Sequence, residues 1–294
     1  MNMEVIRPRA DWTRDLEVIF LIGAPRSGTT WLQAMLASHS AIYTGPETFF
    51  FGAFGAAEQD FLAPKERRVG LGEYLSADEF YGLMGELFWR SVSALPAPAG
   101  TPGFFLEKTT HHGEHGGFIL KTFPRARFIH LVRDARAVVA SLLRASQGWG
   151  KSWAPSGVRA ATGVWSSLVR SSRSIKSLVP HPNQYTEVKY EDLRRAPEHR
   201  LAELFQWIGV EADPALVTRT VEDNVLFRVN GQGFSSIPAI AKNGGASTAG
   251  TYPDGFFGPA PDSIENVDLS WLQRRRVERL AGDLLRDLGY LKGR

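Results

Sequence analysis

The chain has 294 residues, of which 43% are hydrophobic and 22% are charged, and its formal net charge is +3. This composition is typical of soluble globular proteins, and the absence of cysteine excludes a disulfide framework, a thiolate metal site and a cysteine nucleophile. A mild positive charge does not by itself indicate a nucleic-acid partner, but it suits an enzyme that binds anionic small molecules. The first apolar run, Val18–Ile22, is too short for a signal peptide or a membrane span, so we expect a cytoplasmic protein without a membrane partner.

The segment that begins with this run has the pattern of a phosphate-binding turn. Val18–Ile22 predicts a buried strand, Gly23 and Pro25 break it, and a helical apolar pattern begins at Thr29 and Thr30. When a strand, a glycine loop and a helix follow one another, the loop N–H groups and the helix N-terminus point at one place. The helix dipole favours an anion there, so the pattern predicts an anion site.

The charged residue in this loop indicates which anion it suits. Gly23 and Gly28 have the spacing of a nucleotide-binding P-loop, but Thr29 stands where the P-loop requires lysine. The only cation in the loop is Arg26, two residues before Gly28. Because the lysine that reaches the β- and γ-phosphates is absent, we predict an anion other than a triphosphate. The alternative is a structural turn without a ligand.

A carboxylate with aromatic neighbours comes next. We predict a short second strand at 41–44, and Glu47 follows it, directly before Phe49–Phe51. Desolvation by those rings would make the carboxylate a better proton acceptor, as a general base requires. The alternative is a surface glutamate in a turn whose neighbours enter the core, and the stretch alone does not decide between them.

A lysine stands at the exit of the next predicted strand. Helical stretches are expected around 77–95 and a linker at 96–102, before a short strand within 103–110 that ends near Lys108. In open α/β sheets, ligands bind at the carboxyl ends of the strands. Lys108 therefore lies near the glycine loop if this strand neighbours the first one. The alternative is a solvated lysine at a strand end.

The histidines that follow match a zinc-protease pattern in letters only. His111–His115 reads H-x-x-E-H, which needs a helix to bring both histidines to one face. Gly113, Gly116 and Gly117 argue against a firm helix, so we predict no metal site. His111 or His112 acting singly as a proton acceptor is the more plausible role, since imidazole titrates near neutral pH.

A second basic strand end follows the buried run 127–132. Arg133 stands directly after this predicted strand, and a helix then carries Ser141 about two turns from its start. This arrangement again places a basic group at the carboxyl end of a strand. The competing interpretation is a Walker-B-like strand with Asp134 on magnesium, which the missing loop lysine disfavours.

The rest of the chain completes the predicted architecture. We predict an α/β fold, P-loop-like and three-layered, with a central, mostly parallel sheet and helices on both faces. A strand is expected at 185–190. We treat 1–294 as a single domain with a nucleotide-binding core at 15–210, and predict a C-terminal helix at 271–288. The glycine-, serine- and proline-rich residues 230–262 predict a lid or binding loop.

In combination, these segments resemble the sulfotransferases that use 3'-phosphoadenosine 5'-phosphosulfate. Pro25–Trp31 is similar to their 5'-phosphosulfate loop, in the arginine form of the tyrosylprotein sulfotransferases. Leu131–Ser141 is similar to their 3'-phosphate motif, and Gly45–Phe50 to the glutamate segment of the tyrosylprotein and heparan sulfate enzymes. Glu107–Thr109 resembles an element of the heparan sulfate group, and Val188–Leu193 resembles another recurrent segment. The resemblance covers roughly residues 18–210.

The resemblance implies a role for each of these positions. Glu47 is the expected catalytic base, and Arg26 and Lys108 are expected to stabilise the charge of the transferring group. The nucleotide is expected to bind to Arg26, Ser27, Gly28, Thr29, Thr30, Trp31, Arg133, Ser141 and Tyr190. The implied reaction is metal-free in-line transfer of a sulfuryl group to a small-molecule or carrier-bound hydroxyl.

Two other functions stay open on the sequence. A P-loop-type kinase or nucleotide hydrolase with a degenerate loop would need ATP and magnesium, and a nucleotide-binding module would bind without turnover. The chain also departs from the cytosolic steroid and phenol enzymes. It has an extra residue between Lys108 and His111, and it lacks their Arg-Lys-Gly element near the C-terminus. The sequence identifies neither the acceptor nor the oligomeric state.

Overall fold

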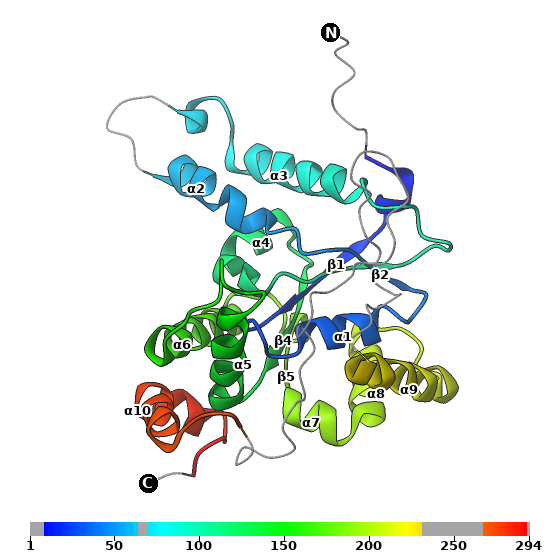
Figure 1. The fold of residues 1–294 in the computed structure, drawn as a ribbon. Helices are drawn as coiled ribbons and strands as arrows, with labels where there is room; N and C mark the ends of the chain where they lie inside the picture. Colours follow the sequence, from blue (N-terminus) through cyan, green and yellow to red (C-terminus); the bar gives the residue numbers. More distant parts are fainter. Residues whose placement is uncertain (1–8, 64–69, 231–266, 293–294) are drawn as a thin grey trace.

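The centre of the molecule is a parallel β-sheet (Figure 1). The computed structural model describes residues 9–63, 70–230 and 267–292. Within these ranges five strands pair in the order β2-β3-β1-β4-β5, and every pairing is parallel. The strands are β1 (Glu17–Ile22), β2 (Ile42–Thr44), β3 (Phe104–Glu107), β4 (Arg127–Val132) and β5 (Tyr185–Lys189).

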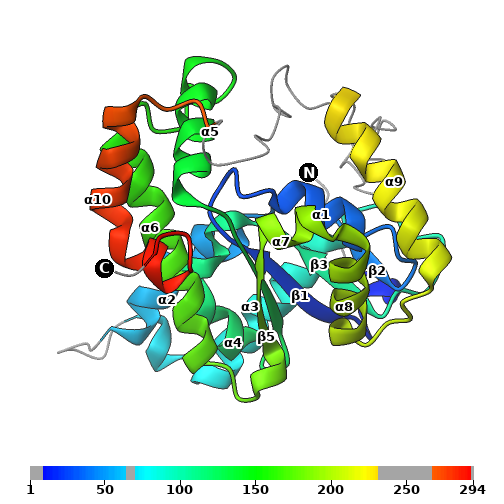
Figure 2. The same ribbon diagram turned by 90° about the horizontal axis from the view of Figure 1, so that it is seen from below.

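Helices cover both faces of this sheet (Figure 2). One layer consists of α1 (Thr29–Leu36), α7 (Tyr190–Arg195), α8 (Pro197–Ile208) and α9 (Pro214–Asn230). The other consists of α2 (Phe50–Leu62), α3 (Ala77–Val92), α4 (Gly116–Thr122), α5 (Ala135–Gln147), α6 (Val158–Ser174) and α10 (Trp271–Asp287). The predicted three-layer α/β fold with helices on both faces is therefore confirmed.

The two-sided burial explains why the strands are continuous apolar runs. In β1, Ile19 and Leu21 pack into the core beneath α1 and α8. Val18, Phe20 and Ile22 point the opposite way, into the aromatic core beneath α2 and α3. A strand that is covered on both faces has no solvent side, so the alternation of polar and apolar residues disappears.

The strand topology fixes where a ligand can bind. β1 lies between β3 and β4, and the chain crosses over β1 when it passes from β3 to β4. Such a switch point opens a crevice at the carboxyl ends of the central strands. The condition for placing Lys108 near the glycine loop was that its strand neighbours the first strand, and this condition is met because β3 pairs with β1.

The elements expected at 41–44, 103–110, 127–132 and 185–190 are all found as strands. The C-terminal helix expected at 271–288 is α10, whereas α2, α4 and α9 were not predicted, and α4 begins at the two glycines, Gly116 and Gly117, that argued against a helix. The predicted lid at 230–262 lies outside the described residues, apart from the last residue of α9. None of the helices described is long and apolar enough to cross a membrane. The cytoplasmic location stays a prediction.

Candidate active site

The loop after β1 has a backbone that two glycines make possible. Gly23 has a φ of +151°, and a Cβ there would lie 2.4 Å from the carbonyl oxygen of Leu131 in β4. Gly28 has a φ of +99° and precedes α1, and a Cβ there would lie 2.7 Å from the ring of Tyr190. Both positions combine a left-handed backbone with a close approach, so they exclude other residues. The turn has the predicted strand, loop and helix geometry.

The side chains after Arg26 line the start of α1. Thr29 and Trp31 are buried, and the Trp31 ring packs edge-on against Tyr190 at 5.8 Å between centroids. The Ser27 hydroxyl is buried and makes no hydrogen bond to any residue in the described part of the chain. A hydroxyl without a partner at a helix N-terminus can donate to an anion held in the loop.

Arg26 is the cation of this loop and reaches towards α5. Its own φ is +73°, and its Nε donates to Ser141 Oγ at 3.0 Å. Its guanidinium lies over the ring of Trp149, 5.2 Å from the centroid. Burial lowers the pKa of Arg26 to about 10, with smaller contributions from Arg133 and Arg144. A desolvated cation next to other cations gains free energy when an anion binds.

Arg133 stands at the carboxyl end of β4, beside the loop. Its Nη1 donates to the Arg26 carbonyl at 3.1 Å, and its guanidinium lies 4.2 Å from the centroid of the Tyr190 ring. Trp165 on α6 fixes the turn, because its indole Nε1 donates to the Arg133 carbonyl at 2.9 Å. The structure thus brings together Arg26, Arg133 and Ser141, three of the residues expected to bind the nucleotide. Tyr190 is buried between the loop and Arg133.

The neighbouring Asp134 has a structural role. It is the N-cap of α5, and its carboxylate accepts from the Arg136 backbone N–H at 2.8 Å. The Arg136 side chain also donates to both carboxylate oxygens, at 3.0 and 2.6 Å. The Walker-B interpretation assigned the Asp134 carboxylate to magnesium. Arg136 is hydrogen-bonded to both oxygens of this carboxylate, which argues against that interpretation.

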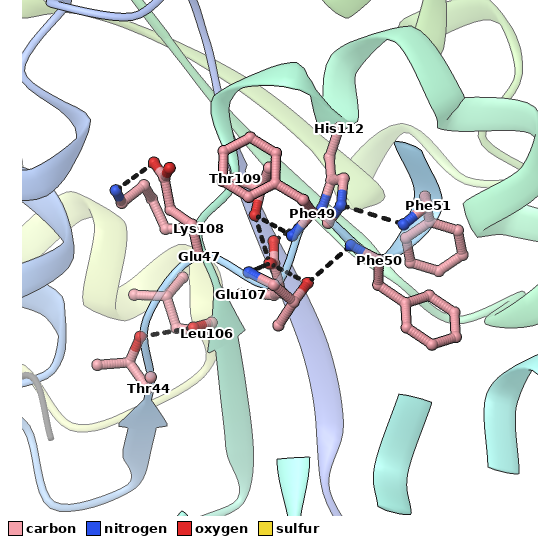
Figure 3. Close-up of polar contacts among 12 residues, drawn as sticks. Thr44, Glu47, Phe49, Phe50, Phe51, Leu106, Glu107, Lys108, Thr109 and His112 are labelled. Carbon is pink, nitrogen blue, oxygen red and sulfur yellow. Dashed lines mark hydrogen bonds and ion pairs between the residues drawn. The ribbon is translucent and has the colours of Figure 1, made fainter. Parts of the chain in front are cut away.

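The second half of the site is an ion pair across β2 and β3. Lys108 Nζ donates to Glu47 Oε1 at 2.5 Å (Figure 3). The Lys108 side chain is 9% exposed and the Glu47 side chain 29% exposed, so the carboxylate is the more accessible partner. Lys108, directly after β3, and Glu47, in the turn after β2, were predicted separately and are in direct contact.

The phenylalanines after Glu47 do not surround its carboxylate. Phe50 and Phe51 begin α2 and are buried in the aromatic core with Phe88. Their rings point away from the Glu47–Lys108 pair in Figure 3. Phe49 is 48% exposed. The expectation that these rings desolvate Glu47 is thus not met, because α2 carries them into the core and the carboxylate faces an ammonium group.

The sequence analysis did not predict the burial of the glutamate next to Lys108. Glu107 is the last residue of β3, and it is 1% exposed. Its carboxylate accepts from Thr48, Thr109 and His112. Burial raises the pKa of the Glu107 carboxyl, but His112 and the two threonine hydroxyls outweigh burial, so the pKa lies below its ordinary value. The signal available in the sequence was the alternation along β3, which points consecutive residues to opposite faces.

The histidines occupy different environments. His112 is completely buried, with Nδ1 2.8 Å from Glu107 Oε2 and Nε2 accepting from the Phe51 N–H at 3.4 Å. Both ring nitrogens are engaged, so His112 is not placed to take a substrate proton. His111 is partly exposed and contacts Glu114 at 3.2 Å. Residues 110–115 form a 3₁₀ turn, and no cluster of His, Asp or Glu in the described ranges is arranged to hold a metal ion.

Comparisons with known proteins show the family of the chain. A family model described as "Sulfotransferase family" matches residues 18–214, which is more than half of the chain. The chain belongs to the sulfotransferase family. The matched range includes the glycine loop, Glu47, Lys108, Arg133 and Ser141.

Similar sequences include a mouse protein-tyrosine sulfotransferase 1, which is 32% identical over 135 residues. That alignment covers 44% of this chain and 35% of the mouse protein, so it spans about a third of the relative's length. A Caenorhabditis briggsae protein named as a putative protein-tyrosine sulfotransferase is 22% identical over 199 residues, covering 66% of both chains.

Similar solved structures share the fold at low sequence identity. A mouse sulfotransferase complexed with PAP has a TM-score of 0.58 and 13% identity, covering 99% of this chain and 93% of that chain. The sulfotransferase domain from the curacin biosynthetic pathway has a TM-score of 0.55 and 20% identity, covering 92% of this chain and 97% of that domain.

Proposed function

We propose that this protein is a sulfotransferase that uses 3'-phosphoadenosine 5'-phosphosulfate as donor and a hydroxyl group as acceptor. One observation carries the proposal above all. The arginine-bearing loop after β1 and the Glu47–Lys108 pair lie at the same edge of one parallel sheet, because β3 and β4 flank β1. Membership of the family supports the same activity.

The donor would bind with its two phosphorylated ends on different elements. The 5'-phosphosulfate would lie in the loop, against the N–H groups and hydroxyls of Ser27–Trp31, at the N-terminus of α1. The 3'-phosphate would contact Arg133 and Ser141, and Tyr190 would contact the nucleotide beside them. The existing contact of Arg26 with Ser141 supports this assignment, since it links the two phosphate positions through one side chain.

In the proposed reaction, the acceptor oxygen forms a bond to sulfur while the bond from sulfur to the oxygen of the 5'-phosphate breaks. Glu47 accepts the proton of the acceptor hydroxyl, and 3'-phosphoadenosine 5'-phosphate leaves. Lys108 and Arg26 stabilise the negative charge on the transferring group and on the bridging oxygen. As in phosphoryl transfer, positioning and electrostatic stabilisation supply most of the rate enhancement.

The acceptor is proposed to be a small-molecule or carrier-bound hydroxyl. The half-exposed Phe49, two residues from Glu47, supports an acceptor with an apolar or aromatic part. The similar mouse protein is named a protein-tyrosine sulfotransferase, so a phenolic hydroxyl is the first acceptor to test. A panel of 2-naphthol, a tyrosine-containing peptide and 1-hexanol, each with donor labelled in its sulfate, compares a phenol, a peptide and an aliphatic alcohol.

A thermal-shift comparison separates this proposal from a kinase or a nucleotide hydrolase. At 100 times its dissociation constant, 3'-phosphoadenosine 5'-phosphate stabilises the protein by about 2.7 kcal/mol, which raises the melting temperature by several degrees. ATP with magnesium is expected to give a much smaller shift. A larger shift with ATP and magnesium would contradict the proposal, and binding without labelled transfer to any acceptor would favour a non-catalytic module.

A further inference from the structure

Two chain segments that bear the proposed catalytic groups are joined by hydrogen bonds below the site. Thr48 follows Glu47, and its backbone N–H and Oγ1 donate to Glu107 Oε1 at 3.2 and 2.8 Å. Thr109 Oγ1 donates to the same oxygen at 2.7 Å. Glu107 itself directly precedes Lys108. The residue next to the base is therefore bonded to the residue next to the lysine.

The same cluster supplies the hydrogen-bond partners at the start of α2. The N-cap residue Phe49 has a φ of +50° and caps the helix with no side-chain hydrogen bond. Its N–H donates to Thr109 Oγ1 at 3.3 Å, and the Phe50 N–H donates to Thr48 Oγ1 at 3.2 Å. The Phe51 N–H donates to His112 Nε2 at 3.4 Å. Helix starts leave such N–H groups without intrahelical partners, and here Thr48 serves one of them while Thr109 and His112, which follow β3, serve two.

We propose that Glu107 is a positioning residue, which holds the Glu47 turn against the end of β3 so that base and lysine stay in register. This inference rests on the proposed function. Figure 3 shows the network beside the ion pair, to its right in this view, with Glu107 among its hydrogen-bond partners. The alternation of β3 turns Glu107 inward and Lys108 towards the site. Within the described residues, the hydrogen bonds of this network join the Glu47 turn, the β3 end and His112, so we expect its effect on the Glu47–Lys108 half.

The geometry makes the negative charge of Glu107 essential to this role. Both carboxylate oxygens accept hydrogen bonds, Oε1 from the threonines and Oε2 from His112 Nδ1. A glutamine would keep the oxygen for the threonines, but its amide N–H₂ would face the His112 N–H. His112 would then have to change tautomer and lose the Phe51 N–H bond. Glu107→Gln thus loosens the turn while it preserves volume.

The first experiment tests the hydrogen-bonded link between Glu107 and the Glu47 turn, and it needs no acceptor. Hydrogen exchange is compared in wild type, in Glu107→Gln and in the control Glu187→Gln. Glu187 is also a carboxylate beside a histidine, with Oε2 3.4 Å from His130 Nδ1, but it lies on β5. We expect faster exchange of the amides of residues 48–51 in Glu107→Gln only. Unchanged exchange in that segment would overturn the proposal.

The second experiment measures kinetics with the acceptor from the panel that is sulfated fastest. Glu107→Gln is expected to lower kcat about 10- to 100-fold, because small displacements of catalytic groups cost rates of this order. The dissociation constant of 3'-phosphoadenosine 5'-phosphate stays within about twofold, and Glu187→Gln keeps the wild-type kcat. In a Glu47→Gln background, Glu107→Gln lowers kcat by less than about threefold, because the group that it positions is already absent.

Several results would overturn the inference. A wild-type kcat in Glu107→Gln would show that Glu107 has no positioning role. The same conclusion follows if Glu107→Gln lowers kcat by the same factor in the Glu47→Gln background as in wild type. Nucleotide binding lost in parallel with kcat indicates a general structural defect instead. If Glu47→Gln alone retains turnover, Glu47 is not the base, while the exchange experiment still tests the hydrogen-bonded link between Glu107 and the Glu47 turn. Should Glu107→Gln not fold, Thr109→Val, which removes one hydroxyl, replaces it in both experiments.

Discussion

The two halves of the site differ in how they balance charge. On the side of β4, Arg26 is desolvated and close to Arg133 and Arg144, which depresses its pKa. On the side of β3, Lys108 and Glu47 neutralise each other, and Glu107 beneath them has hydrogen bonds on both oxygens. We propose that an anionic ligand binds beside these cations in the first half, whereas in the second half a lysine and a glutamate pair with each other. Binding and chemistry should therefore respond to different substitutions.

The largest expected effect belongs to the second half. Glu47→Gln is expected to lower kcat by roughly 10²- to 10⁴-fold, the usual contribution of a general base. Its nucleotide affinity should be unchanged, because the glycine loop and Arg133 are untouched, and calorimetry with 3'-phosphoadenosine 5'-phosphate checks this. The control is Glu114→Gln, which changes a partly exposed carboxylate near His111 and should keep the rate. A near-normal rate in Glu47→Gln would transfer the base role to His111.

Gly28→Ala is expected to disturb the backbone of the glycine loop, in the first half of the site. An added Cβ would lie 2.7 Å from the Tyr190 ring at a φ of +99°, so the loop and ring must move apart. We expect nucleotide affinity to fall at least about tenfold, with a loss of stability of roughly 1–3 kcal/mol. Gly82→Ala on α3, where a Cβ meets nothing within 4 Å, should leave affinity unchanged. Equal affinities in the two variants would show that the loop does not hold the nucleotide.

Arg26→Gln removes the central cation. Charge-assisted hydrogen bonds contribute about 1.5–3 kcal/mol, so affinity for 3'-phosphoadenosine 5'-phosphate should fall about 10- to 100-fold. The free protein should melt no lower than wild type, because a desolvated cation near Arg133 is removed. Arg195→Gln, an exposed arginine on α7, serves as the control in calorimetry and thermal melting. A large loss of melting temperature without a loss of affinity would assign Arg26 a structural role.

The pH dependence of nucleotide affinity tests the role of Arg26 in the first half of the site. The free protein begins to lose the Arg26 proton as the pH approaches about 10, whereas a bound anion favours the protonated form. Nucleotide affinity should therefore fall as the pH rises through about 10, with proton uptake on binding in that range. Calorimetry in buffers of different ionisation enthalpy measures this uptake. An Arg26→Gln variant with the same slope would assign it to another group.

The smallest expected effect lies outside both halves. His130 is buried on β4 and its Nδ1 is 2.8 Å from the Tyr185 hydroxyl. Burial lowers its pKa, and Glu187 offsets this only in part. The unfolded chain therefore takes up the proton first, and the free energy of unfolding should decrease as pH falls below about 6.5. His130→Gln should flatten this slope in denaturant titrations without changing nucleotide affinity, and an unchanged slope would contradict the assignment.

The sequence predicted what local patterns determine. Continuous apolar runs identified the strands, and the glycines around Arg26 identified the turn between β1 and α1. Because a mostly parallel sheet was predicted, the strand ends could be grouped at one edge in advance, and every strand pairing in the described residues is parallel. The pattern did not reveal that Phe50 and Phe51 begin a helix, since their role depends on packing against Phe88 across the chain.

The buried network was beyond sequence reasoning for a similar reason. Glu107 and His112 are titratable residues that look exposed when read singly, and their burial depends on their contact at 2.8 Å and on partners elsewhere in the chain, such as Thr48 and the Phe51 N–H. The pairing of Glu47 with Lys108 joins residues 61 positions apart, which no periodicity records. Tertiary contacts therefore decide which of the predicted polar residues face the site and which support it.

The most direct test of the account is a crystal structure with 3'-phosphoadenosine 5'-phosphate bound. The account predicts the 5'-phosphate within hydrogen-bond distance of the backbone N–H groups of residues 27–30, and the 3'-phosphate on Arg133 and Ser141. Glu47 and Lys108 should then border the space beyond the 5'-phosphate. A nucleotide bound elsewhere, or none at saturating concentration, would contradict the account.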